Sequence, residues 1–175
     1  PSWGHIDNGL ILPPLYPFLI ACGRIFSNET LNIAEYISNL SMIIFAIPTF
    51  LYIRKMASRL VAVVAMVIIQ INYRFFLIGM KPLPESLFLL MIALTLWLML
   101  LFFPEPSRKQ RLLSFVLGIS CSFVFLSRQI GLIIFVFVGI LFIIQYKIIS
   151  GNNRRELLKN YLFTGYGAMA LLIPY

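Results

Sequence analysis

Three short basic clusters divide this chain into apolar runs that carry almost no charge. The clusters hold ten of the fourteen Lys and Arg residues: Arg54, Lys55 and Arg59; Arg108, Lys109 and Arg111; and Lys147, Arg154, Arg155 and Lys159. In multi-span membrane proteins, short loops rich in Lys and Arg stay on the cytoplasmic side. The pattern therefore predicts a polytopic membrane protein whose three basic loops face the cytoplasm.

The composition excludes a soluble domain, because 61% of the residues are hydrophobic, only 11% are charged and the mean hydropathy is +0.94. The net charge of +8 does not indicate nucleic-acid binding. The basic residues lie in loops between apolar runs, where they act as topology signals and contact anionic lipids. Membrane lipids are thus predicted partners, and nucleic acid is not.

The apolar runs are about as long as a bilayer core requires, so we expect an all-α, polytopic transmembrane helical bundle of about six spans. The expected spans are 36–53, 60–80, 86–103, 112–127, 129–146 and one that begins near 160. Residues 1–35 are expected to form an extracytoplasmic loop and a juxtamembrane half-helix, and the bundle occupies 36–175. Because the chain starts without a leader and stops inside an apolar run, we expect a piece truncated at both ends, lacking at least one N-terminal span.

The fourth and fifth expected spans are joined by almost no loop, at Ser127-Arg128-Gln129-Ile130-Gly131. A single continuous helix is the alternative, but it would be too long for one crossing and would place Lys147 on the wrong side. The sequence therefore predicts a tight hairpin. Its polar tip is expected at or just below the non-cytoplasmic face.

This topology leaves a small set of charged residues on the non-cytoplasmic side: Asp7, Arg24, Glu29, Glu35, Arg74, Lys81, Glu85 and Arg128. A charged group near a membrane core costs a few kcal/mol on insertion scales, so such groups mark functional sites by default. We single out Asp7, Arg74, Glu85 and Arg128 as candidates.

Each of these candidates also has a purely structural interpretation. Glu85 follows a proline at a helix start, where free N–H groups and the helix dipole stabilise a carboxylate, and it can pair with Lys81. Arg128 either reaches out to lipid headgroups or clamps a phosphate with its planar guanidinium. For Arg74, contact with headgroups is the favoured interpretation. Asp7 lies in an Asp-Asn-Gly sequence that is typical of an ordinary turn.

Several classes of chemistry are excluded by what the sequence lacks. His5 is the only histidine, so this chain cannot build a multi-histidine metal site. Cys22 and Cys121 have neither metal-ligand spacing nor a disulfide framework. The chain also contains no phosphate-binding loop, dinucleotide fingerprint or nucleophile elbow.

Three stretches resemble motifs of the polytopic GT-C glycosyltransferases. Residues 12–20, Leu-Pro-Pro-Leu-Tyr-Pro-Phe-Leu-Ile, are similar to the PPLYP-type segment that follows the first extracytoplasmic loop of these enzymes. Residues 84–90, Pro-Glu-Ser-Leu-Phe-Leu-Leu, are similar to their (P/S)ES(L/I)F helix start, and 127–132, Ser-Arg-Gln-Ile-Gly-Leu, to their (S/T)RxxGL hairpin. The order of the three motifs agrees with the family over nearly the whole chain.

The resemblance implies transfer of a sugar from a polyprenyl-phosphate donor, usually with inversion, to a lipid, glycan or protein acceptor on the non-cytoplasmic face. It points to bacterial enzymes of the protein-mannosyltransferase and aminoarabinose-transferase type, and so favours a bacterial inner membrane, with the membrane of the endoplasmic reticulum as the alternative. Some members of the family use a divalent metal, and the resemblance implies no other cofactor.

Carried over by position, Arg128 would contact the lipid phosphate, Glu85 would line the site, and Tyr16 would shape the loop beneath the membrane surface. Asp7 matches the acid that acts as base on the acceptor, although in the family this acid often lies further upstream of PPLYP. The base is therefore either Asp7 or a residue that precedes this chain. The predicted catalytic residues are Asp7 and Glu85, and the predicted substrate-binding residues are Arg128, Tyr16, Arg74, Lys81 and His5.

Two other functions are compatible with the same charges. A secondary transporter or a flippase for a lipid-linked substrate would use Arg74, Glu85 and Arg128 to hold and release its cargo. Such transporters often show inverted repeats and broken helices near mid-membrane. Here the charges lie on one side and no repeat is visible, which favours one-sided chemistry. A non-catalytic membrane subunit, in which the charges only anchor helices, is the third hypothesis.

Overall fold

The computed structural model describes residues 14–25, 29–102, 110–149 and 153–173, and this part of the chain is helical and contains no strand. In chain order, the helices are α1 (Leu15–Gly23), α2 (Thr30–Met56), α3 (Arg59–Ile71), α4 (Tyr73–Met80), α5 (Pro84–Phe102), α6 (Arg111–Ser127), the 3₁₀ turn η2 (Gln129–Gly131), α7 (Leu132–Ile148) and α8 (Asn153–Leu172). The predicted all-α class is confirmed. The predicted half-helix is present as α1, and α2 begins at Thr30, before the predicted start of the first span.

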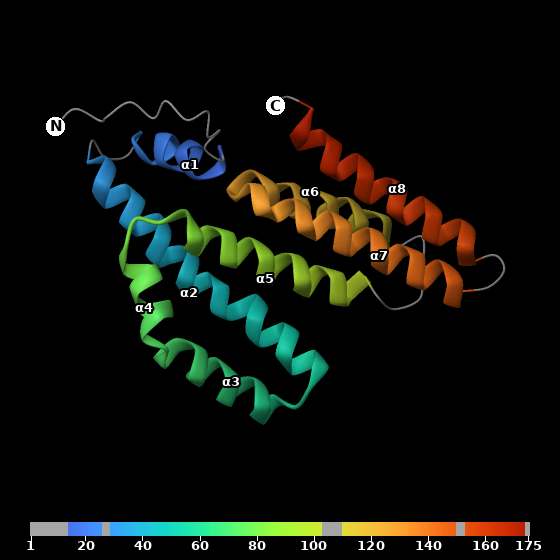
Figure 1. The fold of residues 1–175 in the computed structure, drawn as a ribbon, viewed down its shortest axis with the longest axis horizontal. Helices are drawn as coiled ribbons and strands as arrows, with labels where there is room; N and C mark the ends of the chain where they lie inside the picture. Colours follow the sequence, from blue (N-terminus) through green and yellow to red (C-terminus); the bar gives the residue numbers. More distant parts are fainter. Residues whose placement is uncertain (1–13, 26–28, 103–109, 150–152, 174–175) are drawn as a thin grey trace.

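The bundle has two distinct ends (Figure 1). One end, which we call the α1 end, gathers α1, the starts of α2 and α5, and the end of α6. The other, which we call the basic end, gathers the end of α2 and the starts of α6 and α8. The described members of the three basic clusters all belong to the basic end: Arg54, Lys55, Arg59, Arg111, Lys147, Arg154, Arg155 and Lys159. The fold therefore separates the basic clusters from the candidate site residues Glu85 and Arg128.

Among the described residues, three helical segments are long and apolar enough to cross a membrane: α2, α5 and Gln129–Ile148. The pair α3 and α4 would pass the same test as one bent span, and α6, with 17 residues, is a shorter apolar helix. The chain is thus an integral membrane protein by the length and composition of its helices. The number of about six spans stays a prediction.

The predicted span over 60–80 corresponds to two helices, and the sequence analysis did not predict the break between them. The structure divides it into α3 and α4, which are bent by 64° at a break beside Asn72. Asn72 has an extended conformation and its side chain accepts a hydrogen bond from the backbone N–H of Arg74 at 3.0 Å. Asparagine is a preferred N-cap residue because it satisfies such an otherwise free donor. The polar residue therefore starts a new helix inside an apolar run.

The predicted tight hairpin between the fourth and fifth spans is confirmed. α6 ends at Ser127, Arg128 is extended, and η2 turns the chain into α7, which returns along α6 (Figure 1). The turn requires a close approach at Gly131. A Cβ atom there would lie 2.5 Å from the carbonyl oxygen of Val124. Only glycine fits a backbone so close, which explains the glycine of this motif.

Candidate functional site

Glu85 and Arg128 form an ion pair at the α1 end of the bundle. The Nη2 atom of Arg128 lies 3.2 Å from the Oε1 atom of Glu85, although the two residues come from different helix ends. Glu85 belongs to the first turn of α5, where the helix dipole favours a carboxylate, and Arg128 follows the last residue of α6. Within the described residues, Glu85 therefore pairs with Arg128 and not with Lys81, the partner that its structural interpretation suggested.

A small apolar cluster holds this ion pair in place. Its buried members come from α1, α2, α5 and α6: Leu15, Tyr16, Ala34, Leu87 and Leu126. Leu87 lies two positions after Glu85, and Leu126 lies two positions before Arg128. Packing of the cluster thus brings the start of α5 to the end of α6.

The second carboxylate oxygen of Glu85 is not used by the pair. Oε2 is buried and makes no hydrogen bond to any other residue that the structure describes. A buried acceptor without a partner is costly, by about 1–3 kcal/mol. Because this oxygen is covered by the protein, a ligand hydroxyl could bind it only if the side chains around it moved.

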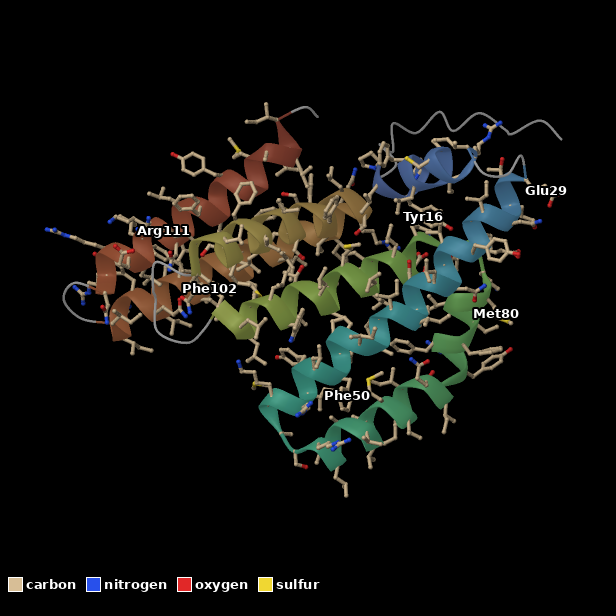
Figure 2. All side chains as sticks on the ribbon, turned by 180° about the vertical axis from the view of Figure 1, so that it is seen from behind. Tyr16, Glu29, Phe50, Met80, Phe102 and Arg111 are labelled. Atoms are coloured by element: carbon tan, nitrogen blue, oxygen red, sulfur yellow. The ribbon has the colours of Figure 1, made fainter. Side chains whose placement is uncertain are left out.

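Tyr16 lies next to this site and is buried between α1 and α2 (Figure 2). Its hydroxyl group is 3.1 Å from the carbonyl oxygen of Ala34 and 3.1 Å from the Oγ atom of Ser38. Burial raises the pKa of Tyr16, the hydrogen bond with Ser38 opposes this effect, and the negative charge of Glu85 adds to the increase. Tyr16 is thus a neutral hydrogen-bonding group near Glu85.

Arg74 and Lys81 lie against a separate cavity. This cavity of about 260 Å³ is lined by Arg74, Leu77, Ile78, Lys81 and Leu83. Neither Glu85 nor Arg128 is among its lining residues. The structure therefore brings Glu85, Arg128 and Tyr16 together and places Arg74 and Lys81 beside the segment that leads into α5.

Asp7 and His5 lie outside the described residues, so their predicted roles as base and substrate contact stay predictions. Among the described residues, no group of three or more His, Cys, Asp or Glu side chains lies close enough to hold a metal ion.

An apolar groove runs along α5 away from the ion pair. It consists of two adjoining cavities of about 160 and 350 Å³ that share Tyr52 and Leu96. Its α5 side is formed by Leu89, Ile92, Leu96, Met99 and Leu100, and its other walls come from α2 and α7. These α5 positions follow Glu85 at spacings of four, seven and eleven residues and beyond, so they occupy the same face of the helix as Glu85. Glu85 and Arg128 do not line the groove themselves; its first α5 residue, Leu89, follows Glu85 by about one helical turn.

A second ion-pair group marks the basic end. The Oε2 atom of Glu156 lies 3.1 Å from the Nη2 atom of Arg111, and its Oε1 atom lies 3.1 Å from the Nζ atom of Lys159. Figure 2 shows Arg111 at the end of the bundle opposite to Tyr16. The hydrogen bond from Lys159, followed by that from Arg111, lowers the pKa of Glu156 below its usual value.

Glu156 should make the stability of the protein depend on pH. Because its pKa is lower in the folded state, its stabilising contribution is complete above the unfolded-state pKa of about 4.3 and is lost as the pH falls through the folded-state value. We expect the Tm of the wild-type protein in detergent to exceed that of Glu156→Gln at pH 7 and to approach it below about pH 4. A Tm difference that does not change over this range would contradict the assignment.

Two residues of the site escaped the sequence analysis. Ser38 and Ser86 are completely buried, and both hydrogen-bond to the backbone of Leu83, just before α5. Ser86 could have been found, because it follows Glu85 at a helix start. Ser38 gave no signal beyond being a hydroxyl residue in an apolar run.

Comparison with known proteins places the chain in a family. No curated protein and no solved structure matches it. The family model described as dolichyl-phosphate-mannose-protein mannosyltransferase matches residues 12–175, which include the PPLYP-type segment, the Glu85 helix start and the Arg128 hairpin. With almost its whole length covered, the chain belongs to the dolichyl-phosphate-mannose-protein mannosyltransferase family of membrane glycosyltransferases.

Proposed function

We propose that this protein transfers a sugar from a polyprenyl-phosphate donor to an acceptor on the non-cytoplasmic face of a bacterial plasma membrane, at the ion pair of Glu85 and Arg128. The observation that carries the proposal is the ion pair itself, with an apolar groove on the same face of α5 that begins four residues after Glu85. A polyprenyl-phosphate sugar has the same two parts, a charged phosphate joined to a long apolar chain. The guanidinium group matches the phosphate, and the groove matches the chain.

The distribution of charge supports the proposed side of the membrane. The basic clusters lie at the end opposite to the pair, and basic loops remain in the cytoplasm. Glu85 and Arg128 would then face the periplasm, which is the side on which the proposed donor presents its sugar.

In the proposed reaction, the bond between the anomeric carbon of the sugar and the phosphate oxygen breaks, and the acceptor oxygen or nitrogen forms a new bond to that carbon. Negative charge develops on the departing polyprenyl phosphate, and the positive charge of Arg128 stabilises it. The acceptor gives its proton to a carboxylate, for which Asp7 is the candidate within this chain. Glu85 orients Arg128 through Oε1.

The test is to supply the full-length protein in proteoliposomes with a panel of radiolabelled polyprenyl-phosphate sugars and acceptors. We expect the label to leave the lipid and to appear on an acceptor or in water. If no donor is turned over and the labelled lipid instead crosses the bilayer intact, the protein is a transporter and the proposal is wrong.

The groove makes a separate prediction about the donor lipid. Leu96 lines both cavities of the groove, so Leu96→Trp should fill the space that the polyprenyl chain needs. We expect the KM for a long-chain donor to rise about tenfold, the scale of a misfit in an apolar pocket, with little change in kcat. The KM for a donor with a very short chain should not change.

The matched control is Ile68→Trp, because Ile68 is exposed on α3 and lines neither cavity of the groove. An equal rise in KM for long-chain and short-chain donors in Leu96→Trp would contradict the placement of the chain in this groove.

A further inference from the structure

Ser38 is a completely buried hydroxyl group in the apolar helix α2. Its Oγ atom is 3.1 Å from the hydroxyl group of Tyr16, donates to the carbonyl oxygen of Leu83 at 3.1 Å and accepts from the N–H of Leu83 at 3.2 Å. A hydroxyl group has one proton and two lone pairs, so Ser38 makes all three contacts when Tyr16 donates to it rather than to the carbonyl oxygen of Ala34. Ser38 thus joins α1, α2 and the segment before α5 at one point.

The backbone of Leu83 is held on both sides. Its N–H donates to the carbonyl oxygen of Lys81 at 2.7 Å and to Ser38, and its carbonyl oxygen accepts from Ser38 and also from the hydroxyl group of Ser86 at 3.0 Å. Only Pro84 separates Leu83 from Glu85, and the φ angle of proline is fixed by its ring. Few soft backbone torsions therefore remain between the clamped Leu83 and the Cα atom of Glu85.

We propose that Ser38 is a positioning residue, which acts through the backbone of Leu83 to hold Glu85 at the distance and orientation at which its carboxylate pairs with Arg128. The inference rests on the proposed function, in which this pair binds the donor phosphate. Ser38 itself touches neither reactant. Its loss would break the link between α2 and the backbone of Leu83, whose N–H would keep only the carbonyl oxygen of Lys81, and would let the first turn of α5 move relative to the end of α6.

The test compares Ser38→Ala with Ser41→Ala in the same assay of donor turnover. Ser41 is also buried in α2, and within the described residues it makes no hydrogen bond to 81–83. We expect Ser38→Ala to lower kcat about 10- to 100-fold, as displacement of a catalytic group by about 1 Å does. Ser41→Ala should stay within about twofold of the wild type.

A double-mutant cycle separates positioning from a general loss of structure. If Ser38 acts only through Glu85, Ser38→Ala should cost nothing further in a Glu85→Gln background, because the effects of coupled residues are not additive. If the two losses multiply, or if Ser38→Ala alone keeps the wild-type kcat, the inference is wrong.

Should Ser38→Ala fail to fold, Ser86→Ala removes the other donor to Leu83 and is measured in the same cycle, with the same criteria. A wild-type protein that turns over no donor would instead overturn the proposed function.

Discussion

Arg128→Ala is expected to lower the rate of sugar transfer about 10²- to 10³-fold, the usual effect of removing one group that stabilises developing charge. The guanidinium group would be lost where the departing phosphate gains negative charge. The fold should survive, because the side chains of Arg128 and Glu85 are 47% and 30% exposed, and exposed ion pairs contribute only about 0–1 kcal/mol to stability. Turnover of a radiolabelled polyprenyl-phosphate sugar in proteoliposomes measures the effect.

The chain offers a matched control for this substitution. Arg111 and Glu156 form a similar ion pair, with 3.1 Å between Nη2 and Oε2, at the opposite end of the bundle. Arg111→Ala should therefore leave the transfer rate within about twofold of the wild type. If Arg128→Ala also keeps the wild-type rate, Arg128 only contacts lipid headgroups, and its assignment to the phosphate is wrong.

Two further variants distinguish charge from geometry at the same site. Arg128→Lys keeps the positive charge but loses the planar, two-pronged donor that suits a phosphate, so its rate should fall between those of the wild type and Arg128→Ala. Glu85→Gln keeps the shape of the side chain and removes the charge that orients Arg128. We expect it to lower kcat by about 10²-fold, on the scale of a misplaced catalytic group.

The sequence placed Glu85 and Arg128 at the same end of the bundle but could not pair them. Topology depends on the alternation of apolar runs and basic loops, and this pattern alone is enough to put both residues opposite the basic clusters. Four bases were assigned to that side, however, and nothing local to Glu85 selects Arg128 over Lys81. Arg128 becomes the partner because Leu87 and Leu126 belong to the same buried cluster, which joins positions far apart in the chain.

The break at Asn72 shows a second limit. A straight span and a broken one have the same composition, so hydropathy over 60–80 cannot distinguish them. The signal was a single asparagine inside an apolar run, and its role as a cap depends on the backbone that it adopts. The hydrogen bonds between Ser38 and Leu83 are even harder to predict from sequence, since they join residues 45 positions apart.

The interface between α6 and α8 supports the second large effect, because there the two backbones approach too closely for any side chain. A Cβ atom on Gly118 would lie 2.0 Å from the carbonyl oxygen of Thr164 and 2.8 Å from the backbone nitrogen of Ala168. Gly167 faces α6 in the same way, with 2.2 Å to the carbonyl oxygen of Phe115. Small residues allow such close packing of membrane helices, and Ser122 adds a hydrogen bond to the carbonyl oxygen of Ala168 at 2.9 Å.

Gly118→Ala should therefore destabilise the protein by about 1–3 kcal/mol, the usual cost of overpacking, even though alanine is the better helix former by about 1 kcal/mol. The clash is with backbone atoms, so no side-chain rotation can relieve it, and α6 must move away from α8. Gly165→Ala is the control, because a Cβ atom at Gly165 on α8 would meet nothing within 4 Å. Thermal unfolding in detergent should show a lower Tm for Gly118→Ala and an unchanged or higher Tm for Gly165→Ala. Equal shifts in both variants would show that the backbones are not in contact at Gly118. Because α6 ends beside Arg128, a displaced α6 should also reduce transfer at temperatures where the variant is still folded.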